Sequence, residues 1–156
     1  MITTRIARGQ YLKGLGALER GDLDALFTQF DERATLTFVG DTPLGACLST
    51  RADLRRWFER FMRMLPERRF EIQRFVVSGT PWNLRLAAHV IIRGAINGEP
   101  YENQFAHFLT LRWGKVVDDL ILEDTQMWAR ACERLAAAGM TEASEGPLMP
   151  IGVHAQ

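Results

Sequence analysis

The sequence is poor in the features that define several specialised classes of protein. Its two cysteines, Cys47 and Cys132, are too few for a disulfide framework or a cysteine metal cluster. Its 19 Lys and Arg residues balance 19 Asp and Glu residues, so there is no basic excess to hold phosphates and we expect no nucleic-acid partner. We expect both cysteines to be free thiols in a reducing cytoplasm.

Long hydrophobic runs are absent as well. No apolar stretch is long enough to cross a bilayer, and the first residues, MITTRIARGQYL, lack the apolar core of a signal peptide. We therefore expect a cytoplasmic protein with no membrane partner. The 156 residues are 47% hydrophobic and 24% charged, which suits one domain with a sizeable core.

The pattern of apolar residues predicts helices followed by strands. Helices are expected over 4–20, 23–30, 51–65 and 125–138, and strands over 34–39, 69–78, 84–96, 102–113 and 116–123. This order favours an α+β class, with a strongly curved, mostly antiparallel sheet wrapped around the N-terminal helices. We expect a domain over 1–139 and an extended or disordered tail over 140–156.

The best-defined local prediction is a hairpin around Asn97-Gly98. A two-residue turn there pairs Ile96 with Glu99 and, further along, Ala88 with His107. His107 then lies on an almost wholly apolar face opposite a small residue, which leaves room for a ligand. The alternative is a core histidine satisfied by a buried partner.

A second histidine and several carboxylates are weaker candidates. The same register turns His89 to the opposite face of the sheet, so a pocket role for it requires a bulge or a different turn. Asp118, Asp119, Glu123 and Asp124 scatter over both strand faces with no histidine at their spacing. We expect a solvated edge or a helix cap there, and no metal site.

Two segments carry a resemblance to a known family. GDLDALFTQFDERATLTF over 21–38 and GKVVDDLILEDT over 114–125 resemble the nuclear transport factor 2-like superfamily, in the right order along residues 4–128. The resemblance implies a cone-shaped fold with an internal pocket and, commonly, a homodimer. Members include SnoaL-like polyketide cyclases, ketosteroid isomerases, scytalone dehydratases and non-catalytic binding proteins, so fold alone does not choose a function.

Residue-by-residue comparison separates these activities. The ketosteroid isomerase donor tyrosine falls on Gly14, its base aspartate on Phe38 and its oxyanion-hole aspartate near His107, so that mechanism is not expected. FVVSGTPW over 75–82 and AHFLTLRW over 106–113 resemble scytalone dehydratase. That family's strand histidine falls on His107, its acidic partner on Glu19, a second histidine on His89, and two carbonyl-orienting tyrosines on Leu18 and Phe38.

The sequence thus predicts a protein that binds a small apolar molecule, cyclic or carbonyl-bearing, inside a cone. Any chemistry is expected to be proton transfer by His107, oriented by Glu19, of the dehydratase, isomerase or cyclase type and without metal or cofactor. A non-catalytic binding protein and a mainly structural homodimer remain as alternatives. The predicted ligand-binding residues are Leu18, Phe38, Trp57, Phe61, His89, Val90, Phe105 and Leu109.

Overall fold

The computed structural model describes residues 2–152. Its elements are α1 (Ile2–Arg20), α2 (Leu23–Phe27), β1 (Phe30–Phe38), β2 (Ala46–Leu48), α3 (Arg51–Met64), β3 (Arg68–Thr80), β4 (Asn83–Ile96), β5 (Glu99–Arg112), β6 (Lys115–Glu123), α4 (Thr125–Ala137) and the 3₁₀-helix η1 (Thr141–Ser144). No helix among the described residues has the length and apolarity needed to cross a membrane.

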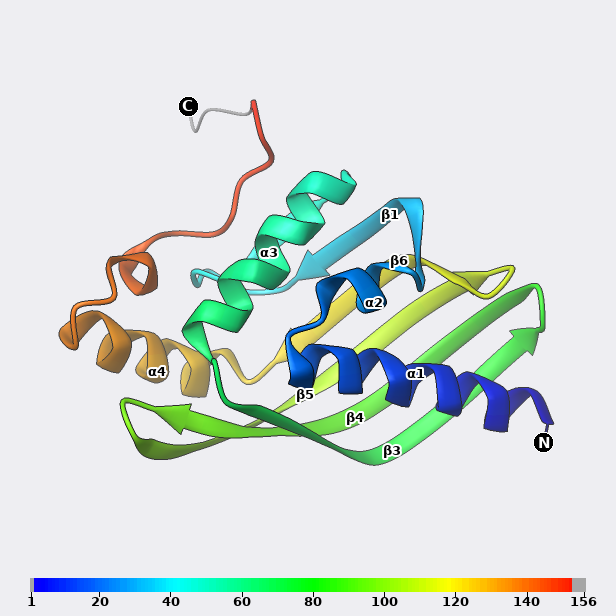
Figure 1. Cartoon of the computed structure of the whole chain (residues 1–156), viewed down its shortest axis with the longest axis horizontal. Helices are drawn as coiled ribbons and strands as arrows, with labels where there is room; N and C mark the ends of the chain where they lie inside the picture. Colours follow the sequence, from blue (N-terminus) through cyan, green and yellow to red (C-terminus); the bar gives the residue numbers. More distant parts are fainter. Residues whose placement is uncertain (1, 153–156) are drawn as a thin grey trace.

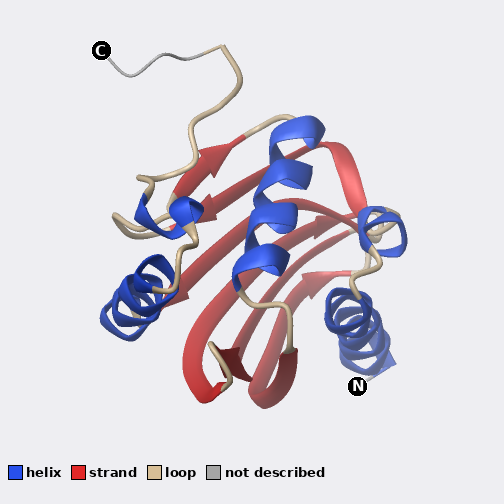
Figure 2. Cartoon of the chain, turned by 60° about the vertical axis from the view of Figure 1, so that its left-hand side comes forward, coloured by secondary structure: helices blue, strands red, loops and turns tan. Residues whose placement is uncertain are grey.

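The strands form one curved, open sheet. Its order is β2-β1-β6-β5-β4-β3, with β1 parallel to β6 and every other pair antiparallel. Helix α3 crosses in front of the concave side, with α1 and α4 on either side of it (Figures 1 and 2). The predicted α+β class, a curved and mostly antiparallel sheet around the helices, is confirmed.

The long hairpin forms as its turn predicts. Asn97 and Gly98 both have positive φ, 53° and 81°, the backbone conformation of a tight two-residue turn. Ile96 pairs with Glu99, and Ala88 pairs with His107. The pairing turns alternate residues of β4 and β5 into the core, which positions His107 on the concave face.

Helix α2 and the short strand β2 differ from the prediction. Helix α2 ends at Phe27, because Phe30 already pairs with Val116 in the sheet. The short strand β2 was not predicted, because three residues give too little alternation to recognise. The side chains of Asp22 and Thr50 cap α2 and α3.

The C-terminal segment contacts the domain where the structure describes it. Leu148 is buried and forms a parallel bridge with Ala46 at the sheet edge. Helix η1 follows α4, and Ala143 within it is also buried. The predicted tail over 140–156 therefore includes packed residues up to 148, while 153–156 lie outside the described part of the chain.

Candidate functional site

An apolar cavity lies between the helices and the concave face of the sheet. The empty space within it, including the part open to solvent, is about 930 Å³. Six of the predicted ligand-binding residues line it: Leu18, Phe38, Trp57, Phe61, Phe105 and Leu109. His107 lines it too, so the wall combines aromatic and aliphatic surface with one imidazole.

His107 is held at both ring nitrogens. Its Nε2 lies 2.7 Å from Oδ1 of Asp119, and its Nδ1 lies 2.8 Å from the hydroxyl oxygen of Tyr11. Because a carboxylate only accepts, the neutral ring carries its proton on Nε2, and Nδ1 accepts the hydrogen bond of the Tyr11 hydroxyl. Asp119, His107 and Tyr11 form a continuous hydrogen-bonded chain, called here the Tyr–His–Asp chain.

The Tyr–His–Asp chain is well shielded from solvent. The side chains of His107 and Asp119 are 12% and 3% exposed, and Tyr11 is buried. Burial, and secondarily the negative charge of Asp119, raise the pKa of the Tyr11 hydroxyl far above its ordinary value. Tyr11 therefore stays protonated, as a donor to His107 should.

Asp119 reaches the cavity because of an irregularity in β6. Thr110 pairs with Asp118, whereas the next residue, Leu111, pairs with Val116, so Val117 is an extra residue in the ladder. Such a bulge reverses which residues face inward. Strict alternation from Val116 would have pointed Asp119 outward. We had expected a solvated edge or a helix cap here, because the four carboxylates scatter over both strand faces with no histidine at their spacing.

Tyr11 was not predicted, although a helical pattern was available to find it. Ala7, Tyr11, Leu15 and Leu18 recur at helical spacing, and all four line the cavity. The resemblance to ketosteroid isomerase had placed a donor tyrosine at Gly14, where an added Cβ would lie 2.9 Å from Oε1 of Gln29. Tyr11, one turn earlier on α1, brings a hydroxyl to the same cavity wall.

The predicted pairing of Glu19 with His107 is not formed. The Glu19 carboxylate instead accepts a 2.8 Å hydrogen bond from the backbone N–H of Phe70 and lies 3.5 Å from the Arg69 guanidinium. Glu19 is the next-to-last residue of α1, whereas Tyr11 lies at the middle of that helix. It fastens α1 to β3, and Asp119 occupies the place beside His107 that we had expected for Glu19.

Two other predicted ligand-binding residues lie off the cavity wall. His89 faces the other side of the sheet, where its Nε2 lies 2.8 Å from Oε1 of Gln104. Strand β4 is regular on its β5 side, so no bulge turns His89 inward. Val90 points inward but is wholly buried behind the lining residues.

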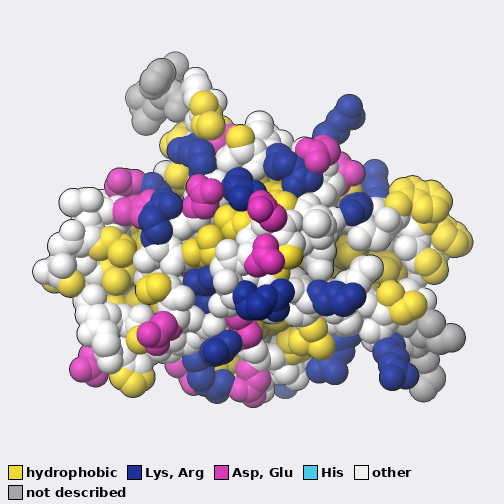
Figure 3. Space-filling model, in the orientation of Figure 1, with side chains coloured by type: hydrophobic (Ala, Val, Ile, Leu, Met, Phe, Trp, Pro, Cys, Tyr) yellow, Lys and Arg dark blue, Asp and Glu magenta, His cyan; other side chains and the backbone are white. Residues whose placement is uncertain are grey.

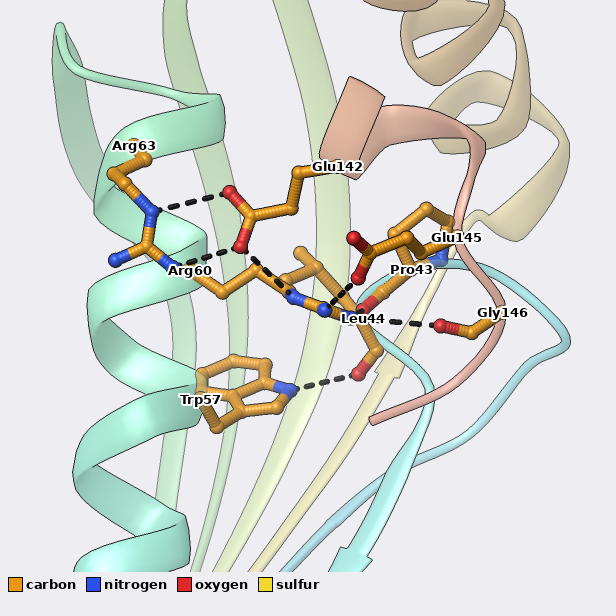
Figure 4. Close-up of polar contacts among 8 residues, drawn as sticks. All are labelled: Pro43, Leu44, Trp57, Arg60, Arg63, Glu142, Glu145 and Gly146. Atoms are coloured by element: carbon orange, nitrogen blue, oxygen red, sulfur yellow. Dashed lines mark hydrogen bonds and ion pairs between the residues drawn. The ribbon is translucent and has the colours of Figure 1, made fainter. Parts of the chain in front are cut away.

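A polar cluster around Arg60 lies beside Trp57, which is part of the cavity wall (Figure 4). Arg60 is buried, donates a 2.8 Å hydrogen bond to the carbonyl of Pro43, and pairs with both Glu142 and Glu145. One turn earlier on α3, the Trp57 indole N–H donates to the carbonyl of Leu44 at 2.7 Å. These bonds hold Trp57 in the cavity wall.

The cavity reaches solvent between α1 and the β5–β6 turn. Gln10 and Gly114 are exposed there and still line the cavity. Beside this opening, Trp82 and Trp113 are 54% and 82% exposed, with ring centroids 6.5 Å apart. Hydrophobic side chains gather at that end of the molecule, over the tips of the sheet (Figure 3).

Fold and cavity together define a small cone-shaped domain whose curved sheet encloses an apolar binding pocket. The family model of the SnoaL-like domain matches residues 10–119, so the chain belongs to this family of the nuclear transport factor 2-like superfamily. The family is one of small-molecule-binding and cyclase- or isomerase-type folds. No curated protein matches the sequence.

Solved structures share the fold at low sequence identity. PrhC from Penicillium brasilianum is 19% identical, with 93% of this chain and 99% of that chain covered and a TM-score of 0.77. IdmH from Streptomyces antibioticus, described as a candidate polyketide cyclase, is 16% identical, with 81% and 97% covered and a TM-score of 0.67. A candidate polyketide cyclase from Xanthomonas campestris is 19% identical, with 81% and 96% covered and a TM-score of 0.59.

Proposed function

We propose that this protein binds a small, apolar, carbonyl-bearing ring compound in its cavity and removes a proton from the carbon next to the carbonyl. The observation that carries the proposal is the Tyr–His–Asp chain, a polar relay in a mostly apolar wall. Dehydration, isomerisation and cyclisation of carbonyl compounds all use such a proton transfer. Two structural neighbours described as candidate polyketide cyclases support this reaction class.

Both nitrogens of His107 are already occupied, which decides how the proton moves. The ligand proton passes to the Tyr11 oxygen while the hydroxyl proton of Tyr11 passes to Nδ1 of His107. The electron pair of the broken C–H bond becomes the C=C bond of an enolate. The imidazolium that results is stabilised by Asp119, the part an orienting carboxylate has in acid–base triads. No tyrosinate has to exist on its own.

Exchange of deuterium into 2-tetralone tests this proposal. 2-Tetralone is an apolar bicyclic ketone with acidic hydrogens next to its carbonyl, and ¹H NMR in D₂O follows their loss. We expect the protein to accelerate exchange and His107→Gln to lower the acceleration by about 100-fold, the usual contribution of a general base. His89→Gln, on the outer face of the same sheet, is the matched control and should exchange at the wild-type rate.

Two results would separate the alternatives. Binding of 2-tetralone without accelerated exchange would favour a non-catalytic binding protein. Equal exchange by wild type and His107→Gln would remove His107 from the chemistry.

We also infer a homodimer that uses the outer face of the sheet. Phe108 and Leu122 point outward on the neighbouring strands β5 and β6 and are 43% and 41% exposed. Ala106 pairs with Leu122, and Leu120 pairs with Phe108, which extends the apolar surface across both strands. A second copy of the same face would cover it, as expected for a two-fold symmetric interface.

A further inference from the structure

A second carboxyl group lies on the cavity wall apart from the Tyr–His–Asp chain. Glu123, the last residue of β6, lines the cavity and pairs with Phe105 across the ladder. Among residues 2–152 its carboxyl group has no hydrogen-bond or ion-pair partner. It is an unpaired acid in an apolar cavity, and the mechanism above does not use it.

The surroundings of Glu123 favour its neutral form. Burial, and then the charge of the neighbouring Asp124, raise its pKa from 4.5 to about 8. The other titratable groups that interact with it are Tyr101 on β5 and Cys132 on α4. Burial raises the pKa of both, that of Cys132 to about 12, so neither supplies charge near neutral pH.

The position of Glu123 relative to His107 suits a ligand that spans the two. His107 pairs with Ile121, and Phe105 pairs with Glu123, so the two side chains lie on the same face, one inward-pointing pair apart. A two-residue step along a strand is about 7 Å. A ring compound with a carbonyl can therefore lie with its oxygen toward Glu123 and an adjacent carbon toward Tyr11.

We propose that Glu123 donates a hydrogen bond to the carbonyl oxygen of the ligand and so selects carbonyl compounds over hydrocarbons of the same shape. This assignment rests on the proposed function, because it needs the ligand to occupy the cavity. When the proton leaves the carbon, negative charge builds on the carbonyl oxygen, and a neutral O–H group already aimed at it stabilises that charge. An ionised carboxylate would repel it.

Glu123 would take the part of the carbonyl-orienting group, for which the two matching positions of this chain have no hydroxyl. The carbonyl-orienting tyrosines of scytalone dehydratase fall on Leu18 and Phe38, which have no hydroxyl. Glu123 lies on a different element from either of them. It also lies at another position than the one near His107 where the oxyanion-hole aspartate of ketosteroid isomerase falls. The carbonyl-polarising group of this chain is therefore one that residue-by-residue transfer from those families does not give.

Binding of 2-tetralone, ¹³C-labelled at its carbonyl, tests the assignment, with tetralin as the probe of the same shape without oxygen. In wild type and in Glu123→Gln, which keeps a donor, we expect the bound carbonyl signal downfield of its position in Glu123→Leu. The affinity of Glu123→Leu for 2-tetralone should fall about 10-fold, as expected for one lost hydrogen bond. Its affinity for tetralin should stay within about twofold, because the apolar wall is intact.

An unchanged carbonyl signal in Glu123→Leu, with normal binding of both probes, would overturn the assignment and leave the proposed function standing. Failure of both 2-tetralone and tetralin to bind any variant would overturn the proposed function itself, and the assignment with it. The two failures are thus distinguishable, because in the first both probes bind and in the second neither does.

The pH dependence gives a second readout. In wild type the carbonyl signal should move upfield as the pH rises past about 8, when Glu123 loses its proton. In Glu123→Gln it should not move, because an amide does not titrate. A shift common to both proteins would belong to His107, Tyr11, Asp119 or Asp124, which both retain, and would overturn the assignment.

Discussion

The Asp119 carboxylate lies 2.7 Å from Nε2 of His107, in a cavity wall where both side chains are nearly inaccessible to solvent. Asp119→Asn should therefore impair both exchange activity and stability. The amide is a poorer partner for the imidazolium, and a mismatch at a buried hydrogen bond costs about 1–3 kcal/mol. Urea unfolding and the 2-tetralone assay measure the two effects. Asp118→Asn, the exposed neighbour on the opposite strand face, is the matched control; equal losses in both variants would contradict a special position for Asp119.

Tyr11→Phe should impair proton transfer through Tyr11 while the His107 ring keeps its orientation. The substitution removes only the hydroxyl and keeps the ring, so we expect a stability loss of about 1 kcal/mol. Nitrogen NMR of His107 should still find the proton on Nε2, because Asp119 holds it there, while exchange into 2-tetralone falls. Wild-type exchange in Tyr11→Phe would show that the ligand reaches His107 directly.

Glu123 should make the protein less stable in mild alkali. Its pKa is about 8 in the folded protein against 4.5 ordinarily, so between these values the folded state keeps a proton that the unfolded chain has lost. The free energy of unfolding consequently falls as the pH rises from about 5 to about 8, by at most about 5 kcal/mol. Urea unfolding at pH 5 and pH 9 should reveal a smaller difference in Glu123→Gln. Glu99→Gln, on the exposed hairpin turn, should behave as wild type; a wild-type pH dependence in Glu123→Gln would contradict the prediction.

Arg60 should matter more for stability than its neighbour Arg63. Arg60 is buried and joins α3 to the Pro43 carbonyl and to the two C-terminal glutamates. We expect Arg60→Ala to cost about 2–4 kcal/mol, because it leaves the Pro43 carbonyl unpaired and opens a packed contact. Arg63→Ala should cost less than about 1 kcal/mol, since the Arg63 side chain is 55% exposed. Thermal unfolding of both variants checks this, and equal losses would contradict a special contribution of the buried Arg60.

The outer face of the sheet should decide the oligomeric state. If Phe108 and Leu122 lie in a two-fold interface, Phe108→Glu should convert a dimer into a monomer in sedimentation at low micromolar concentration. A charge at the centre of an apolar contact has no partner there. The exchange rate per chain should stay the same, because Phe108 points away from the cavity. A wild-type monomer would contradict the inferred homodimer.

The parts of the fold that could be predicted are those that one local rule determines. Asn97-Gly98 fixes a turn, the turn fixes the register, and the register puts His107 on the concave face. Asp119 escaped prediction because the extra residue Val117 in β6 reverses the inward and outward positions, and no local signal marks it. Tyr11 was not predicted because helical spacing indicates which residues share one face of the helix, but not the strand against which that face packs.

The two carboxyl groups on the inner face of β6 have a stereochemical consequence. Asp119, Ile121 and Glu123 alternate along one strand, so the relay to His107 and the unpaired acid are fixed on one wall in one order. A ring held between them presents only one of its two faces to Tyr11. We therefore expect deuterium to enter a single prochiral position of each methylene next to the carbonyl, and the cavity to distinguish mirror-image ketones.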